Sequence, residues 1–185
     1  MKLQSVLISL AVIALLVVIF YPWKEQEYHA HADFRVVVNG ERLDFGQEKY
    51  MTEGSFLLSK YVHLHDNDGD VIHVHNNEVA LGDFFASLKF KLNKTCLITD
   101  MNLTYCTGDG KALQMFVNGK ETPAFHTYEP HDLDRILIIY GNGSDIEKEI
   151  NLVTDKACIQ SGTCPERGAA YNESLSCGPG SFCVG

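Results

Sequence analysis

The chain has 185 residues, of which 45% are hydrophobic and 21% are charged, so its composition is that of a globular protein and excludes wholesale disorder and fibrous repeats. Its 24 acidic and 15 basic residues give a formal net charge of −9, and an acidic surface repels nucleic acid and anionic lipid. We therefore expect no nucleic-acid partner, and one domain with short appendages rather than two full domains.

The first 23 residues predict a transmembrane signal-anchor. The run over 3–23 is almost entirely apolar, contains no charged residue and ends in Tyr21-Pro22-Trp23. About 20 such residues span the hydrocarbon core of a bilayer, and Tyr and Trp are typical of its boundary. A cleavable signal peptide is the alternative, but its apolar region is shorter and is followed by small residues. We therefore expect a single-pass protein of the cell membrane, with its C-terminal domain outside the cytoplasm.

After a linker over 24–28, the chain predicts a β-hairpin. Residues 29–38 alternate polar and apolar side chains, which is the pattern of a strand with one buried face. The dipeptide Asn39-Gly40 predicts a two-residue turn, and this turn pairs Val36 with Leu43.

Further hairpins and short helices follow. Residues 61–75 predict a second hairpin, and a short helix begins at Leu81. A third hairpin turns at Asn118-Gly119, and 135–140 reads as a buried strand. A capping box over 144–147 predicts a second helix. Together these elements predict an α+β domain of β-hairpins with two helices, for which a β-grasp-like sheet is a compatible topology.

The cysteines predict a disulfide framework. Their number is even, all follow the apolar run, and they fall into locally spaced couples, which is typical of exported proteins. The six are Cys96, Cys106, Cys158, Cys164, Cys177 and Cys183. The first two bracket a turn and are expected to face each other across two strands, whereas the other pairings stay open. We therefore divide the part after the linker into a His-rich α+β domain over 29–158 and a disulfide-rich tail over 159–185.

Six of the eight histidines occur in His-x-His pairs. On a strand, residues two apart share a face, so each pair presents two imidazoles to one metal ion. The predicted metal ligands are His29, His31, His63, His65, His73 and His75. The remaining two, His126 and His131, flank a loop and are expected at the surface.

The register of the 61–75 hairpin decides whether two of these pairs meet. A three-residue loop that ends with Gly69 in the left-handed region sets His63 opposite His73 and places all four imidazoles on one face. A two-residue loop places the two pairs on opposite faces. The nearby carboxylates of Asp33, Asp66 and Asp70 are candidates to orient the ring N–H groups.

The kind of metal follows from the ligand type. Imidazole suits Zn, Cu, Ni and Fe, and few Met together with disulfide-type cysteines argue against Cu(I), so we expect Cu(II) or Zn(II). Binding for uptake, buffering or delivery is the leading hypothesis.

No residue is predicted to be catalytic. Dithiol oxidoreductases normally use C-x-x-C, whereas the two late cysteine couples are both C-x5-C. The sequence also contains no Gly-rich phosphate loop, no nucleophile elbow and no H-E-x-x-H motif. A thiol–disulfide oxidoreductase and a structural or adhesive domain are the alternative functions.

Four segments resemble a known family. H-A-H-A-D-F-R-V-V-V-N-G, Y-V-H-L-H-D-N-D-G-D-V-I-H-V-H, L-G-D-F-F and D-L-D-R-I-L-I-I-Y-G look like small, single-pass, exported His-rich proteins of environmental bacteria and archaea. The tail D-K-A-C-I-Q-S-G-T-C-P-E-R-G is similar to members labelled protein-disulfide isomerase, a label that disagrees with the missing C-x-x-C. The resemblance covers most of 29–168. Related members resemble this hairpin with an acidic residue in place of His75, which is also a metal-ligand type.

Overall fold

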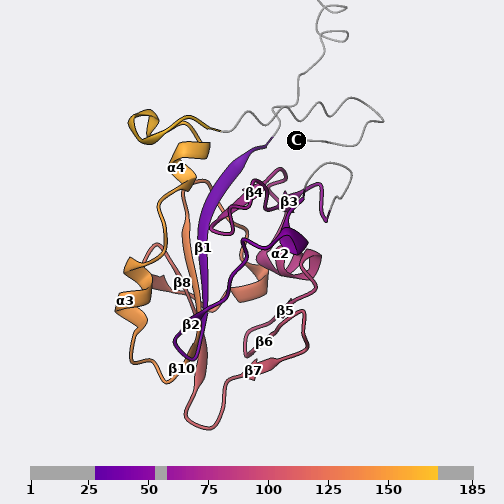
Figure 1. Cartoon of the computed structure of the whole chain (residues 1–185). Helices are drawn as coiled ribbons and strands as arrows, with labels where there is room; N and C mark the ends of the chain where they lie inside the picture. The colour runs from indigo at the N-terminus through magenta and orange to yellow at the C-terminus, as the bar shows by residue number, and fades with distance from the viewer. Residues whose placement is uncertain (1–27, 53–57, 171–185) are drawn as a thin grey trace, which may run out of the picture.

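A seven-stranded mixed sheet forms the frame of the fold (Figure 1). The computed structural model describes residues 28–52 and 58–170. The strands follow the order β3-β4-β1-β10-β8-β9, and β2 pairs with β1 beside β4. They are β1 (Ala30–Val38), β2 (Glu41–Arg42), β3 (Val62–His63), β4 (Val71–Val74), β8 (Ala112–Val117), β9 (Lys120–Glu121) and β10 (Arg135–Gly141).

The remaining elements pack around this sheet. A second, three-stranded sheet contains β5 (Lys91–Leu92), β6 (Cys96–Ile98) and β7 (Thr104–Cys106). The α-helices are α2 (Leu81–Ser87), α3 (Ile146–Asn151) and α4 (Ala157–Gln160), and short 3-10 helices cover Glu48–Tyr50, Phe125–Thr127 and Pro165–Arg167. Helices α2 and α3 lie on opposite faces of the large sheet (Figure 1).

The two central strands are buried on both faces. Strands β1 and β10 run parallel, and Val36 lies opposite Ile138. The larger core lies on the α2 side and contains Phe34, Phe84 and Phe85, whereas a smaller core on the α3 side is built around Val37 and Leu137 (Figure 1). Strands covered on both faces read as continuous apolar runs, which explains the V-V-V and I-L-I-I segments.

The two Asn-Gly turns are confirmed. Asn39 and Gly40 have φ of 51° and 86°, the left-handed conformation that a type I′ hairpin turn needs. The Leu43 N–H donates to the Val36 carbonyl at 2.9 Å, so the predicted register holds. The turn at Asn118-Gly119 has the same conformation, with φ of 51° and 77°.

The β3-β4 hairpin has the predicted register with a different turn. His63 lies opposite His73, as a three-residue loop requires. The left-handed residues, however, are Asp66 and Asn67, with φ of 56° and 55°, and the Asp68 N–H donates to the His65 carbonyl at 3.0 Å. Gly69 is not left-handed, so the predicted bulge is wrong.

The structure contradicts the predicted transmembrane helix and the predicted location in the cell membrane. The three α-helices in the described part of the chain have 7, 6 and 4 residues, against the roughly 20 that span a bilayer. No helix within residues 28–52 and 58–170 is long and apolar enough to cross a membrane. The segment over 1–23, on which the prediction was based, lies outside the described residues.

The described residues form an α+β domain as predicted, but the number of helices and the sheet arrangement differ from the prediction. Three α-helices are present in the described residues instead of two, because the region after 146 is divided between α3 and α4. The predicted capping box does not form, since the Ser144 hydroxyl donates to Asn142 and Asp145 and no side chain caps α3. The sheets also differ from a simple β-grasp-like set of hairpins, since a separate three-stranded sheet accompanies the seven-stranded one.

Gly69→Ala should destabilise the fold. A Cβ at this position would lie 2.2 Å from the Gly46 nitrogen and 2.4 Å from the Phe45 carbonyl carbon, so the backbone of the hairpin must move. Overpacking of this kind costs about 1–3 kcal/mol or more, measurable by urea denaturation. Gly141→Ala is the matched control, because a Cβ there meets nothing within 4 Å, and we expect a change below about 0.5 kcal/mol. Equal stability of the two variants would contradict this account.

Candidate metal site

All six predicted histidines lie together on one side of β3, β4 and β1, three within the strands and three just beyond the strand ends. Side chains alternate along a strand, and the residues between the histidines belong to the core on the other face. These intervening core residues are Ala30, Ala32, Val62, Leu64, Ile72 and Val74. Pairing across the strands sets His31 opposite His73, and His73 opposite His63.

The six imidazoles form a closed circuit of neighbouring rings, which we call the histidine cluster. Neighbouring ring centres are between 3.8 and 5.8 Å apart. In order around the circuit, the rings are His29, His31, His73, His65, His63 and His75, and the last again contacts the first. The structure therefore brings together every residue that the sequence predicted as a ligand.

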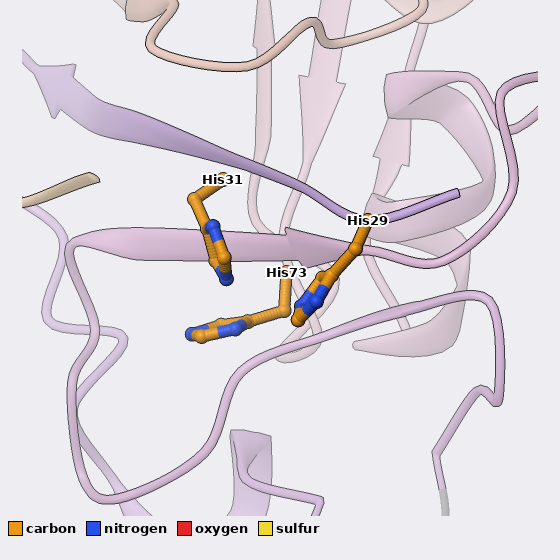
Figure 2. A group of neighbouring side chains, drawn as sticks. All are labelled: His29, His31 and His73. Carbon is orange, nitrogen blue, oxygen red and sulfur yellow. The ribbon is translucent and has the colours of Figure 1, made fainter. Parts of the chain in front are cut away.

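Three members of the cluster have nitrogens close enough to share an ion. One ligand atom from each of His29, His31 and His73 lies within 4.8 Å of the others. Figure 2 shows His29 and His31 extending from one strand and His73 from its neighbour toward a common region. His31 and His73 are buried, with 4% and 1% exposure, whereas His29 is exposed. Nitrogens bound to one tetrahedral ion are about 3.3 Å apart, so small ring rotations complete this site.

A carboxylate relay orients His31. Its Nδ1 lies 2.8 Å from the Ser161 hydroxyl, which in turn donates to Asp132. Since the single hydroxyl proton goes to the carboxylate, Ser161 accepts from the His31 Nδ1–H, and Nε2 then carries the lone pair. Such hydrogen bonds behind an imidazole fix its tautomer and orientation in metal sites.

A second relay orients His73. The His65 Nδ1–H donates to Asp66, which leaves His65 Nε2 as an acceptor. His73 Nδ1 lies 3.1 Å from that nitrogen and therefore donates to it. His63 is oriented in a similar way, because its Nδ1 lies 3.1 Å from the Ser59 carbonyl, which can only accept.

The segment that carries Ser161 is anchored on a buried carboxylate. Asp33, at 1% exposure, accepts from the Lys156 and Ala157 N–H groups at 2.8 and 2.9 Å and from the Thr154 hydroxyl. Burial raises the pKa of the Asp33 carboxyl, and these hydrogen bonds offset the rise only in part.

An ion-pair cluster ties the same segment to the hairpin turn. Lys156 Nζ lies 2.8 Å from Asp70 and 3.2 Å from Asp68. Burial lowers the pKa of Lys156, but the hydrogen bond to Asp70 and the charge of Asp68 outweigh it, so the pKa is raised. Of the three carboxylates predicted to orient imidazoles, Asp66 therefore contacts a ring, while Asp33 and Asp70 hold the surrounding segments.

The remaining two histidines lie apart from the cluster, and two residues of the site were not predicted. His126 and His131 form no ring contact with the cluster within the described ranges, and His131 instead lies 3.6 Å from Asp134. Sequence reasoning missed Ser161 and Asp132, since neither stands near a His-x-His pair in the chain. No local signal identified them, because Ser161 lies between Cys158 and Cys164 and Asp132 directly follows His131.

The disulfide prediction is confirmed where the structure describes it. Cys96 bonds to Cys106 across β6 and β7, at directly opposed positions. Cys158 bonds to Cys164 around α4, and the described residues contain no free cysteine. Cys177 and Cys183 lie outside the described residues.

Comparison of the chain with protein-family models, with curated proteins and with solved structures found no match. The resemblance to exported His-rich proteins therefore stays a prediction.

Asp33→Ala should destabilise the domain by about 3 kcal/mol or more. The change leaves two backbone N–H groups and a hydroxyl without their acceptor, at about 1–3 kcal/mol for each buried donor. Chemical denaturation measures the loss. Glu78→Ala, at an exposed position, is the control and should change stability by less than about 0.5 kcal/mol. A loss of the same size in both variants would refute the anchoring role of Asp33.

Proposed function

We propose that this protein binds a transition-metal ion, Cu(II) or Zn(II), through His29, His31 and His73 and serves to buffer or deliver it. The observation that carries the proposal is the convergence of three imidazoles from two paired strands, with ligand atoms within 4.8 Å of one another. His31 and His73 are buried and each is held through Nδ1 by a hydrogen bond, which is the arrangement of a built site and not of a solvated polar face.

The ligand chemistry supports Cu(II) or Zn(II) over other ions. Three imidazoles form a nitrogen donor set, which suits these borderline metals. Thiolate ligands, which favour Cu(I), are absent from the described residues, since all four cysteines there are in disulfides. Hydrogen bonds donated by Nδ1 of His31 and His73 leave Nε2 of each ring as the atom that can bind a metal.

The exposure of the site favours exchange of the ion over permanent retention. His29 is exposed while its two companions are buried, so one side of the site faces solvent. Three protein ligands also leave a fourth position of a tetrahedral ion for water or for a ligand from another molecule. An ion held in this way can be acquired and released, as buffering or delivery requires.

The alternative functions have less support. A thiol–disulfide oxidoreductase needs a reactive, accessible cysteine, but Cys158 and Cys164 are each only 8% exposed and lack the C-x-x-C spacing. A purely structural domain accounts for the disulfides but leaves the converging imidazoles and their carboxylate relays without a role.

Replacing His29, His31 and His73 together by Ala should weaken the tightest metal-binding step by at least about tenfold, because each ligand contributes to affinity. Calorimetric titration of the full chain with Cu(II), and separately with Zn(II), measures this step. The control is His126→Ala with His131→Ala, which removes two imidazoles outside the cluster and should bind as the unmodified protein does. The proposal fails if the unmodified chain and the triple variant bind equally poorly.

Ser161→Ala should weaken the same step by about 10–100-fold, since the change removes the acceptor that orients His31. Ser144→Ala is the matched control, because that hydroxyl bonds only to Asn142 and Asp145 at the start of α3. The comparison again uses calorimetric titration. Unchanged affinity in Ser161→Ala would remove this residue from the site.

A further inference from the structure

We propose that the histidine cluster holds two metal ions, the second bound by His63, His65 and His75. This inference rests on the proposed function and concerns the three imidazoles that the first ion leaves unused. It starts from the closed circuit of six rings. His63 contacts both His65 and His75, and these two in turn contact His73 and His29, which are ligands of the first ion.

One ion cannot use the whole cluster in its observed form. Neighbouring strands are about 4.8 Å apart, so imidazoles on β1 and β3, which flank β4, start about 9.5 Å apart. Ligand nitrogens of one tetrahedral ion are only about 3.3 Å apart. An ion between β1 and β4 therefore leaves His63 and His65 to a second position.

Two of the three ring pairs in this second trio have nearly the spacing that shared ligation needs, and side-chain rotation must bring His65 and His75 together. The ring centre of His63 lies 4.9 Å from that of His75 and 5.8 Å from that of His65. With metal–nitrogen bonds of about 2.0–2.1 Å, ring centres on one tetrahedral ion are about 5 Å apart. The observed values are within about 1 Å of this distance, which ring rotation can supply.

The hydrogen bonds of this trio also point to ligation. His63 donates Nδ1–H to the Ser59 carbonyl and His65 donates to Asp66, so Nε2 is the donor atom on both rings. His65 Nε2 accepts a hydrogen bond from His73, so a second ion must displace the bond that orients a ligand of the first ion, which makes the second binding step weaker.

Each proposed ion has a carboxylate nearby that offsets its positive charge. A carboxylate stands behind one imidazole of each trio, Asp132 through Ser161 for His31 and Asp66 directly for His65. Two divalent ions one strand spacing apart nevertheless repel each other, so the second should bind at least about tenfold more weakly than the first.

Titration of the full chain with Cu(II) tests the inference, with metal analysis after desalting as a second count. We expect two stepwise equivalents for the unmodified protein. His63→Ala with His75→Ala should abolish the weaker step and leave the tighter one, because this pair of changes keeps the His65–His73 hydrogen bond. His29→Ala with His31→Ala should retain one equivalent at the second position.

Two controls and one spectroscopic readout complete the test. Variants His126→Ala with His131→Ala, and Cys177→Ser with Cys183→Ser, should both retain two equivalents. Electron paramagnetic resonance of the unmodified chain should show isolated Cu(II) at one equivalent and dipolar broadening at two, a readout that does not depend on any variant folding.

The outcomes separate the two proposals. A single equivalent that stays spectroscopically isolated, and that His63→Ala with His75→Ala leaves intact, overturns the two-ion site but not the proposed function. Loss of the second equivalent in the cysteine variant also overturns it. The absence of any binding by the unmodified chain overturns both.

Discussion

Backbone pairing between β1 and β4 is the interaction on which the candidate site depends. It sets His31 directly opposite His73, while the alternation of side chains sends Ala32 and Ile72 into the core. A slip of one residue would exchange these two sets and bury imidazoles among apolar side chains. The apolar face therefore specifies the position of the polar one, and the geometry of the site is secured by core packing.

A second constraint comes from the buried carboxylate of Asp33. It lies on the same strand as His29 and His31, and its hydrogen bonds hold the start of α4 against that strand. Lys156 extends this attachment to the β3-β4 turn through Asp68 and Asp70. The sheet, the hairpin turn and the α4 segment are thus fastened at one end of the molecule, where the imidazoles also lie. This rigidity keeps ligands from three strands within reach of one another.

Local signals made much of the fold predictable. Asn39-Gly40 and Asn118-Gly119 formed the expected turns because Asn and Gly tolerate positive φ. The buried strand, the helix from Leu81 and the Cys96–Cys106 bond also followed from pattern and spacing. The predicted turn of the β3-β4 hairpin was wrong for a non-local reason. Glycine is required at position 69 by its close approach to Gly46, and Asp66 and Asn67 take the left-handed conformation instead.

The candidate site was likewise predictable only in part from the sequence. His-x-His spacing was enough to identify all six imidazoles, since strand periodicity determines which face they share. It did not rank His29, His31 and His73 ahead of the other three histidines, because that ranking depends on the antiparallel pairing that places β1 beside β4. Nor did it reveal Ser161 and Asp132, whose contacts with His31 depend on the folded path of the whole chain.

The contact between His31 and Ser161 joins residues 130 positions apart, and the contact between His31 and Asp132 joins residues 101 apart. Closing loops of this length is entropically unfavourable and is achieved only when much of the intervening chain is already folded. During synthesis, the imidazole at position 31 therefore emerges long before the hydroxyl and carboxylate that orient it. A fully oriented site is consequently a property of the finished domain, and under the proposed function a nascent or partly unfolded chain would capture ions less well.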